Sequence, residues 1–127
     1  MDGYSTERVN KLREIEFDYT YLTNERWKEI IAVYLKGAKN FEIHCWDEET
    51  EEIAAVLSYG ALKKTGWQYG KIIVGLVTPE FIDFLLEQEK PKDTDIYNKM
   101  TPFFSIFLDN WFSSEHYGTE LHITEPD

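Results

Sequence analysis

The sequence has a single cysteine, Cys45, and no long apolar run, and each of these shortages excludes a structural feature. One cysteine excludes a disulfide within the chain and is typical of a reducing compartment. The longest apolar run, Ile72 to Val77, is far shorter than the roughly 20 residues that a membrane-spanning helix needs. The opening segment, MDGYSTERVNK, has no apolar stretch behind a basic one. We therefore expect a soluble cytoplasmic protein without a targeting peptide.

Positive charge is also scarce, since 13 basic residues face 24 acidic ones and the formal net charge is −11 on 127 residues. A negative field of this size repels nucleic acid and anionic membranes, and it attracts cationic protein surfaces. What the chain does have is core-forming material, with 43% hydrophobic and 16% aromatic residues. That content excludes a disordered chain and predicts one folded domain over residues 1–127.

The first half of the chain alternates strand and helix signals. Apolar and acidic residues alternate over 14–21, which predicts a half-buried strand. Residues 24–37 carry an apolar stripe at helical spacing behind Thr23 or Asn24 as N-cap, and residues 40–46 alternate again as a strand. Residues 50–59 favour a short helix with Thr50 as N-cap, although a strand over 53–59 pairing with 40–46 is an alternative.

The second half predicts a loop, a buried strand, a helix and two more strands. The glycine-containing stretch 63–71 is typical of an exposed loop. The apolar run 72–77 suits a strand inside the sheet, and a helix follows with Thr78 as N-cap and Pro79 in its first turn. Strands over 103–108 and 119–124 would flank a final loop. The expected fold is a single α+β domain, a mostly antiparallel sheet covered by about three helices on one face.

Negative charge is segregated along the sequence. Between Lys39 and Lys63 there are six acidic and no basic residues, and after Lys99 there are five more acidic residues without a basic one. Aromatic residues that commonly anchor protein interfaces lie beside both blocks. The predicted partner-binding residues are therefore Trp46, Asp47, Glu48, Glu49, Glu51, Glu52, Trp111 and Glu115. Acidic runs also occur simply as solvated surface, which is the alternative interpretation.

Candidate chemical sites do not complete a motif. His44 and Cys45 point to opposite faces of a strand, so they cannot converge on one metal ion. His116 and His122, with Glu115 or Glu120, could approach each other but lack the tight spacing of zinc ligands. The run Ser113 to His116 has the residue types of a catalytic triad without a nucleophile elbow, and is predicted to be a polar loop. We expect no catalytic residue, metal or cofactor.

Three segments, FEIHCWDEETEEIAAVLSYG, KIIVGLVTPEF and TPFFSIFLDNWFSSEHYGTELHI, cover over half of the chain. In these segments the chain resembles the small acidic immunity proteins encoded beside bacterial polymorphic or contact-dependent toxins. The resemblance implies a cognate toxin, often a cationic nuclease, that is bound and neutralised in the cytoplasm of the producing cell. It transfers no individual functional residue.

The sequence hypothesis is a non-enzymatic inhibitor whose acidic and aromatic surface docks on a basic toxin. Two other classes stay open. A small enzyme or ligand-binding α+β domain would need an apolar pocket with converging polar groups. An oligomeric regulatory or interaction subunit would use exposed aromatic residues for self-association.

Overall fold

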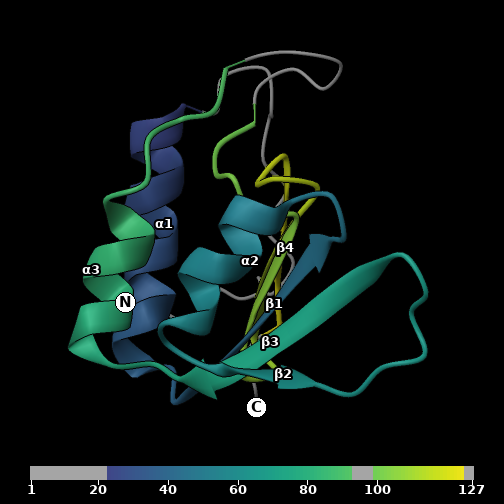
Figure 1. Ribbon diagram of the computed structural model, residues 1–127. Coiled ribbons are helices and arrows are strands. Elements are labelled where there is room, and N and C mark those ends of the chain that lie inside the picture. Colours follow the sequence, from purple (N-terminus) through teal and green to yellow (C-terminus); the bar gives the residue numbers. More distant parts are fainter. Residues whose placement is uncertain (1–22, 93–98, 125–127) are drawn as a thin grey trace, which may run out of the picture.

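The computed structural model describes residues 23–92 and 99–124 (Figure 1). Along the chain these residues form α1 (Asn24–Gly37), β1 (Asn40–Trp46), α2 (Thr50–Leu57), β2 (Ala61–Lys63), β3 (Gly70–Leu76), α3 (Pro79–Leu86), β4 (Ser105–Leu108), β5 (Phe112–Glu115) and β6 (Glu120–Ile123). The strand predicted over 14–21 lies outside the described residues. The α+β class is confirmed.

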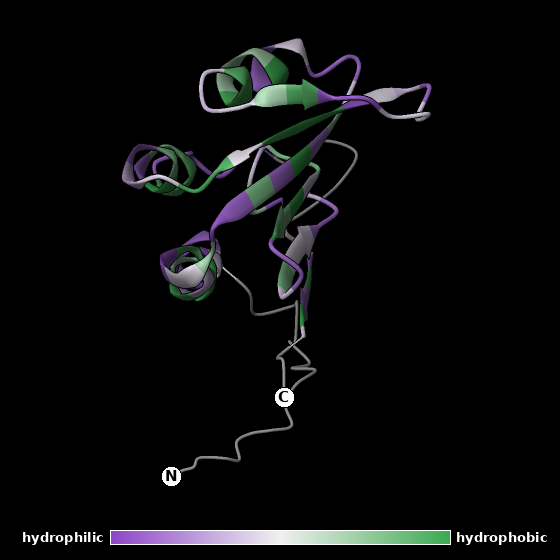
Figure 2. Cartoon of the chain, turned by 90° about the horizontal axis from the view of Figure 1, so that it is seen from below, coloured by the Kyte–Doolittle hydropathy of each residue, from purple (hydrophilic) through white to green (hydrophobic). Residues whose placement is uncertain are grey.

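The strands form one antiparallel sheet in the order β2-β3-β1-β4-β5-β6. Strand β1 lies at its centre, where Ile43 is paired with Ile73 on one side and Ile106 on the other. Strand β3 is flanked by β2 and β1, which confirms that the apolar run 72–77 belongs inside the sheet. The helices lie to one side of the strands, as Figure 2 shows from below.

N-cap residues set the starts of helices α1 and α3 where the sequence predicted them. The Thr23 hydroxyl accepts a hydrogen bond from the Arg26 backbone N–H at 3.0 Å, and the Thr78 hydroxyl accepts one from that of Phe81 at 3.1 Å. These caps satisfy N–H groups that have no partner inside a helix. Residues 50–57 are helical as expected, but the N-cap is Glu49, because Thr50 is already the first helical residue.

The core lies between the helices and the sheet. Alternate residues of β1, namely Phe41, Ile43 and Cys45, are buried there, which confirms Cys45 as a core residue. The rings of Phe41 and Phe81 stack at 4.0 Å, so α3 packs directly on the sheet. The Trp27 indole N–H of α1 donates to the Ser114 hydroxyl of β5 at 3.1 Å, a buried polar link between helix and sheet.

Two strands were missing from the sequence prediction. Strand β2 lies at an edge and all three of its residues are exposed, so no periodic apolar pattern marks it. Strand β5 occupies the segment predicted to be a polar loop. Its serines are buried because each hydroxyl has a partner: Ser114 accepts from Trp27, and Ser113 donates to the Glu115 carboxylate at 3.0 Å. Partners distant in the sequence make a polar strand possible here.

The opposite side of the sheet, which we call the open face, is not covered by any described helix. Alternation along the paired strands places the following residues on it: Glu42, His44, Trp46, Ile72, Val74, Leu76, Phe107, Ser113, Glu115 and His122. Among the apolar residues of this set, Leu76 is 65% exposed, although it belongs to a strand in the interior of the sheet.

Candidate functional site: an acidic corner and an aromatic band

Five predicted partner-binding residues lie together where β1 passes into α2. We call this set, Asp47, Glu48, Glu49, Glu51 and Glu52, the acidic corner. The chain turns tightly here, because the backbone N–H of Glu49 donates to the carbonyl of Trp46 at 2.9 Å. The Trp46 N–H in turn donates to the Glu49 carboxylate at 2.8 Å. The turn therefore holds the whole acidic run at one end of the sheet.

Glu49 is the residue that fixes the corner to the rest of the fold. Its second carboxylate oxygen accepts a hydrogen bond from the Tyr117 hydroxyl at 2.7 Å, across 68 positions of sequence. Burial and, after it, this bond to Glu49 hold the pKa of Tyr117 well above its ordinary value. Glu49 is consequently a structural support of the corner, and its carboxylate has little left to offer a partner.

The other carboxylates of the corner differ in how far they are neutralised. Asp47 pairs with the Lys71 ammonium at 2.7 Å. Glu48 and Glu51 are exposed and Glu52 is half-buried, and none of the three has an ion-pair partner among residues 23–92 and 99–124. Glu51 and Glu52 lie in the first turn of α2, where a negative charge also stabilises the helix. The corner thus carries three carboxylates that no cation of the described residues neutralises.

A chain of rings runs along the same end of the sheet. We call Trp67, Trp46, Phe104 and Tyr117 the aromatic band. The ring centroids are 5.0 Å apart between Trp67 and Trp46, 5.0 Å between Trp46 and Phe104, and 5.3 Å between Phe104 and Tyr117. These tilted and edge-on contacts contribute about 0.5–1.5 kcal/mol each beyond burial.

Gly70 makes room for the band. A methyl group at this position would lie 2.3 Å from the Trp67 ring, so only glycine lets the indole approach the strand this closely. Trp67 comes from the segment predicted to be an exposed loop, yet it is half-buried between the strand and Trp46. The indoles of Trp46 and Trp67 are therefore held rigidly with part of their surface in solvent, as interface anchors commonly are.

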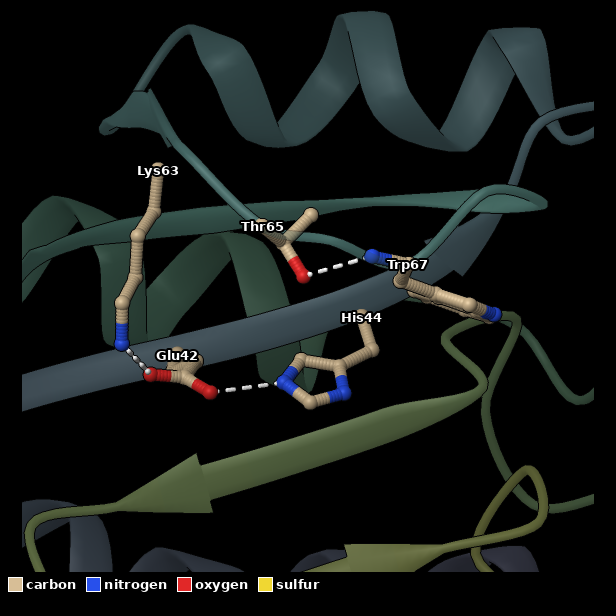
Figure 3. A network of polar contacts seen from close by, with 5 residues as sticks. All are labelled: Glu42, His44, Lys63, Thr65 and Trp67. Carbon is tan, nitrogen blue, oxygen red and sulfur yellow. Dashed lines mark hydrogen bonds and ion pairs between the residues drawn. The ribbon is translucent and has the colours of Figure 1, made fainter.

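Polar side chains continue the site along β1 on the open face (Figure 3). The Glu42 carboxylate lies between two basic groups, with 2.6 Å to Nε2 of His44 and 3.2 Å to the Lys63 ammonium. Burial works to raise the pKa of Glu42, but the hydrogen bonds from His44 and Lys63 outweigh it and the pKa is lowered. Glu42 is therefore ionised near neutral pH.

Phe107 also lies on the open face, and its half-buried ring stands between two shallow hollows. One hollow of about 420 Å³ is lined by Asn40, Phe41, Glu42, Val74, Phe107, Asp109 and Asn110. The other, of about 260 Å³, is lined by Phe107, Asp109, Asn110, Trp111, Phe112, Ser113, His122 and Thr124. Two carboxylates and two amides thus surround this aromatic ridge.

The structure brings only one of the two remaining predicted site residues to the corner. Glu115 pairs with Ser105, which pairs with His44, so it lies at the same end of the sheet as the acidic corner. Trp111 is 51% exposed, but it lies in the turn between β4 and β5 at the opposite end. Trp111 therefore cannot share a single anchor point with Trp46.

The side chains suspected of chemistry have structural roles or pair with one another. Glu120 lies 2.7 Å from His116 and 3.5 Å from His122, so the two histidines do approach each other. No group of three or more histidine, cysteine or acidic residues in the described part of the chain is placed to hold a metal ion. Burial, followed by the nearby charges of Glu49 and Glu52, raises the pKa of Cys45 to about 12, which makes its thiol a poor nucleophile.

The sequence prediction missed Trp67, Phe107 and Lys63 as site residues. Trp67 could have been found from the sequence, because a tryptophan in a glycine-containing loop is a large side chain that packs against a neighbouring surface. For Phe107 the signal was its strand position next to the buried Ile106. The partner of Lys63, by contrast, is known only once β2 is placed beside β3.

Comparison of the chain with family models, with curated proteins and with solved structures found no match. No helix within the described ranges has both the length and the apolar character to span a membrane.

Proposed function

We propose that this chain is an immunity-type inhibitor that binds and neutralises a basic, nuclease-type protein toxin. The observation that carries the proposal is that the acidic corner follows Trp46 directly in the chain, at the end of the sheet where the half-buried indoles of Trp46 and Trp67 contact each other. Glu48, Glu51 and Glu52 offer negative charge without a cationic partner in the described structure, and Trp46 precedes them in the chain. A nuclease must present cations to its phosphate substrate, so an anionic surface that covers those cations blocks it.

The two parts of the site would contribute to different stages of binding. Uncompensated charge attracts an oppositely charged partner over roughly 8–10 Å at physiological ionic strength and so raises the association rate. Desolvated aromatic anchors mainly slow dissociation. The contacts of Glu49 with Trp46 and Tyr117 hold the corner in place before the partner arrives, which lowers the entropy lost on binding.

A charge reversal with a matched control tests the proposal. Glu51 and Glu80 are both exposed glutamates in the first turn of an eight-residue helix, so reversing either changes net charge and helix stability alike. The probe is the protein encoded by the neighbouring gene. We expect Glu51→Lys to lower the association rate about tenfold at low salt, and Glu80→Lys to change it less than about twofold.

Nuclease activity of that neighbouring protein is the second measurement. The unaltered chain should suppress it at equimolar concentration, and Glu51→Lys should require a higher concentration. Absence of binding between the two proteins, or equal effects of the two reversals, would refute the proposed electrostatic inhibition.

A second candidate function is self-association through the open face. The apolar residues Ile72, Val74 and Leu76 follow one another on that face of β3, and Leu76 is 65% exposed. A sheet face of this kind is typically covered by another layer. Sedimentation of the chain alone separates the two ideas, because a homodimer forms without any added protein and Leu76→Lys should then return it to the monomer.

A further inference from the structure

The ridge at Phe107 combines the features that bind a guanidinium group. Such a cation is flat, stacks on aromatic faces, and donates paired hydrogen bonds to a carboxylate. The larger hollow has Phe107 as its aromatic wall and Glu42 as an ionised carboxylate, and the amide residues Asn40 and Asn110 also line it.

Asp109 adds negative charge to both hollows while remaining fixed. Its carboxylate accepts the backbone N–H of Asn40 at 2.9 Å and that of Lys39 at 3.1 Å. The residue has a left-handed backbone with φ of 52°, an uncommon conformation that these hydrogen bonds hold in place. Asp109 therefore contributes its field to a bound cation. Glu42, whose Oε2 is held by His44 at 2.6 Å, offers its other oxygen, Oε1, to the cation.

Lys63 shows that Glu42 already attracts a cation. Its ammonium lies 3.2 Å from Glu42 Oε1, yet the lysine side chain is 53% exposed and the pair is open to water. Exposed pairs of this kind contribute only about 0.2–1 kcal/mol, so a better cation can displace the ammonium. A guanidinium that also stacks on Phe107 would be such a cation, because the lysine makes no contact of that kind.

We propose that the hollow beside Phe107 binds an arginine side chain of the basic partner, with the guanidinium stacked on Phe107 and hydrogen-bonded to Glu42. This inference rests on the proposed function for the identity of the partner. It adds a specific contact on the open face, away from the acidic corner, and makes Lys63 a competitor whose removal strengthens binding.

The experiment uses acetyl-arginine amide as the probe and the intact chain as the receptor, followed by NMR titration. Lys63→Met should tighten binding about two- to fivefold, since it removes the competing ammonium. Lys64→Met is the matched control, because Lys64 is the next residue, is also exposed, and has no described partner, so it changes net charge equally. Glu42→Gln should weaken binding about tenfold through the loss of the charged acceptor.

Resonances of Phe107 should shift during the titration, and Phe107→Leu should weaken binding by removing the aromatic face. The isosteric neutral probe acetyl-citrulline amide should not bind. Equal effects of the Lys63 and Lys64 variants, or shifts confined to the acidic corner, would overturn the arginine site. Those results would leave the proposed inhibition standing, because that proposal is tested separately by the Glu51 and Glu80 reversals.

Discussion

The hydrogen bond between Tyr117 and Glu49 should decide how firmly the acidic corner is held. Tyr117→Phe removes only the hydroxyl, so the ring keeps its edge-on contact with Phe104 and its place beneath the Lys99 ammonium, 4.1 Å from the ring centroid. Tyr117 is buried, with an exposed fraction of 6%. The substitution therefore isolates one polar contact.

The magnitude follows from the character of that contact. A hydrogen bond to a charged group contributes about 1.5–3 kcal/mol when it is buried. Glu49 is only partly buried and water can replace part of the lost bond, so we expect a loss of about 1–2 kcal/mol in the free energy of unfolding. For a domain of this size that corresponds to a fall in Tm of roughly 4–8 °C.

Urea denaturation measures the loss, with Tyr69→Phe as the matched control. Tyr69 is 65% exposed and no hydrogen bond of its hydroxyl occurs in the described structure, so its substitution should change stability by less than about 0.5 kcal/mol. If Tyr117→Phe is as stable as Tyr69→Phe, the bond does not hold the corner. If Glu49→Gln combined with Tyr117→Phe is fully additive, the two side chains are not coupled.

Three further predictions concern single positions. In the native protein the Cys45 thiol should react with a disulfide reagent at pH 8 only as fast as the chain unfolds, because the thiol is buried and its pKa is raised to about 12; reaction at the rate of free cysteine would contradict this. The pKa of Glu42 is lowered in the folded state, so its contribution to stability is present above the ordinary pKa of 4.5 and is lost as the pH falls through the folded value. Urea midpoints measured against pH should therefore fall less steeply on acidification for Glu42→Gln than for the unaltered chain. Gly118→Ala should cost about 2–4 kcal/mol by thermal melting, because φ is +86° and the added Cβ would lie 2.7 Å from that of Met100; a stable variant would contradict the close packing there.

Much of the fold could be predicted because it depends on local patterns. The capping residues Thr23 and Thr78, and the strict alternation of β1, act over a few residues and were found in the sequence. The acidic corner could also be predicted, since its members are neighbours in the chain. The alternation of residues does not show whether another element covers the second face of β3. The exposure of Leu76 on that face could therefore be learned only from the structure.

The missing parts depend on contacts between distant residues. Strand β5 carries no apolar alternation, and Ser114 is stable in the core only because Trp27 donates a hydrogen bond to it. The separation of Trp111 from Trp46 follows from the β4–β5 hairpin, whose turn lies at the far end of the sheet. Sequence proximity to an acidic residue is therefore a poor guide to where an exposed aromatic side chain lies.

The acidic corner and the Phe107 ridge lie towards opposite ends of β1, and their spacing would suit the single partner proposed above. Phe41 to Trp46 of β1 spans roughly 17 Å at 3.3 Å per residue, and the pairing of Glu42 with Phe107 places the ridge near the start of that span. A standard protein interface of about 800 Å² per partner is roughly 30 Å across, so it can cover both. The strand between them carries Glu42 and His44 on the same face, which makes the path continuous.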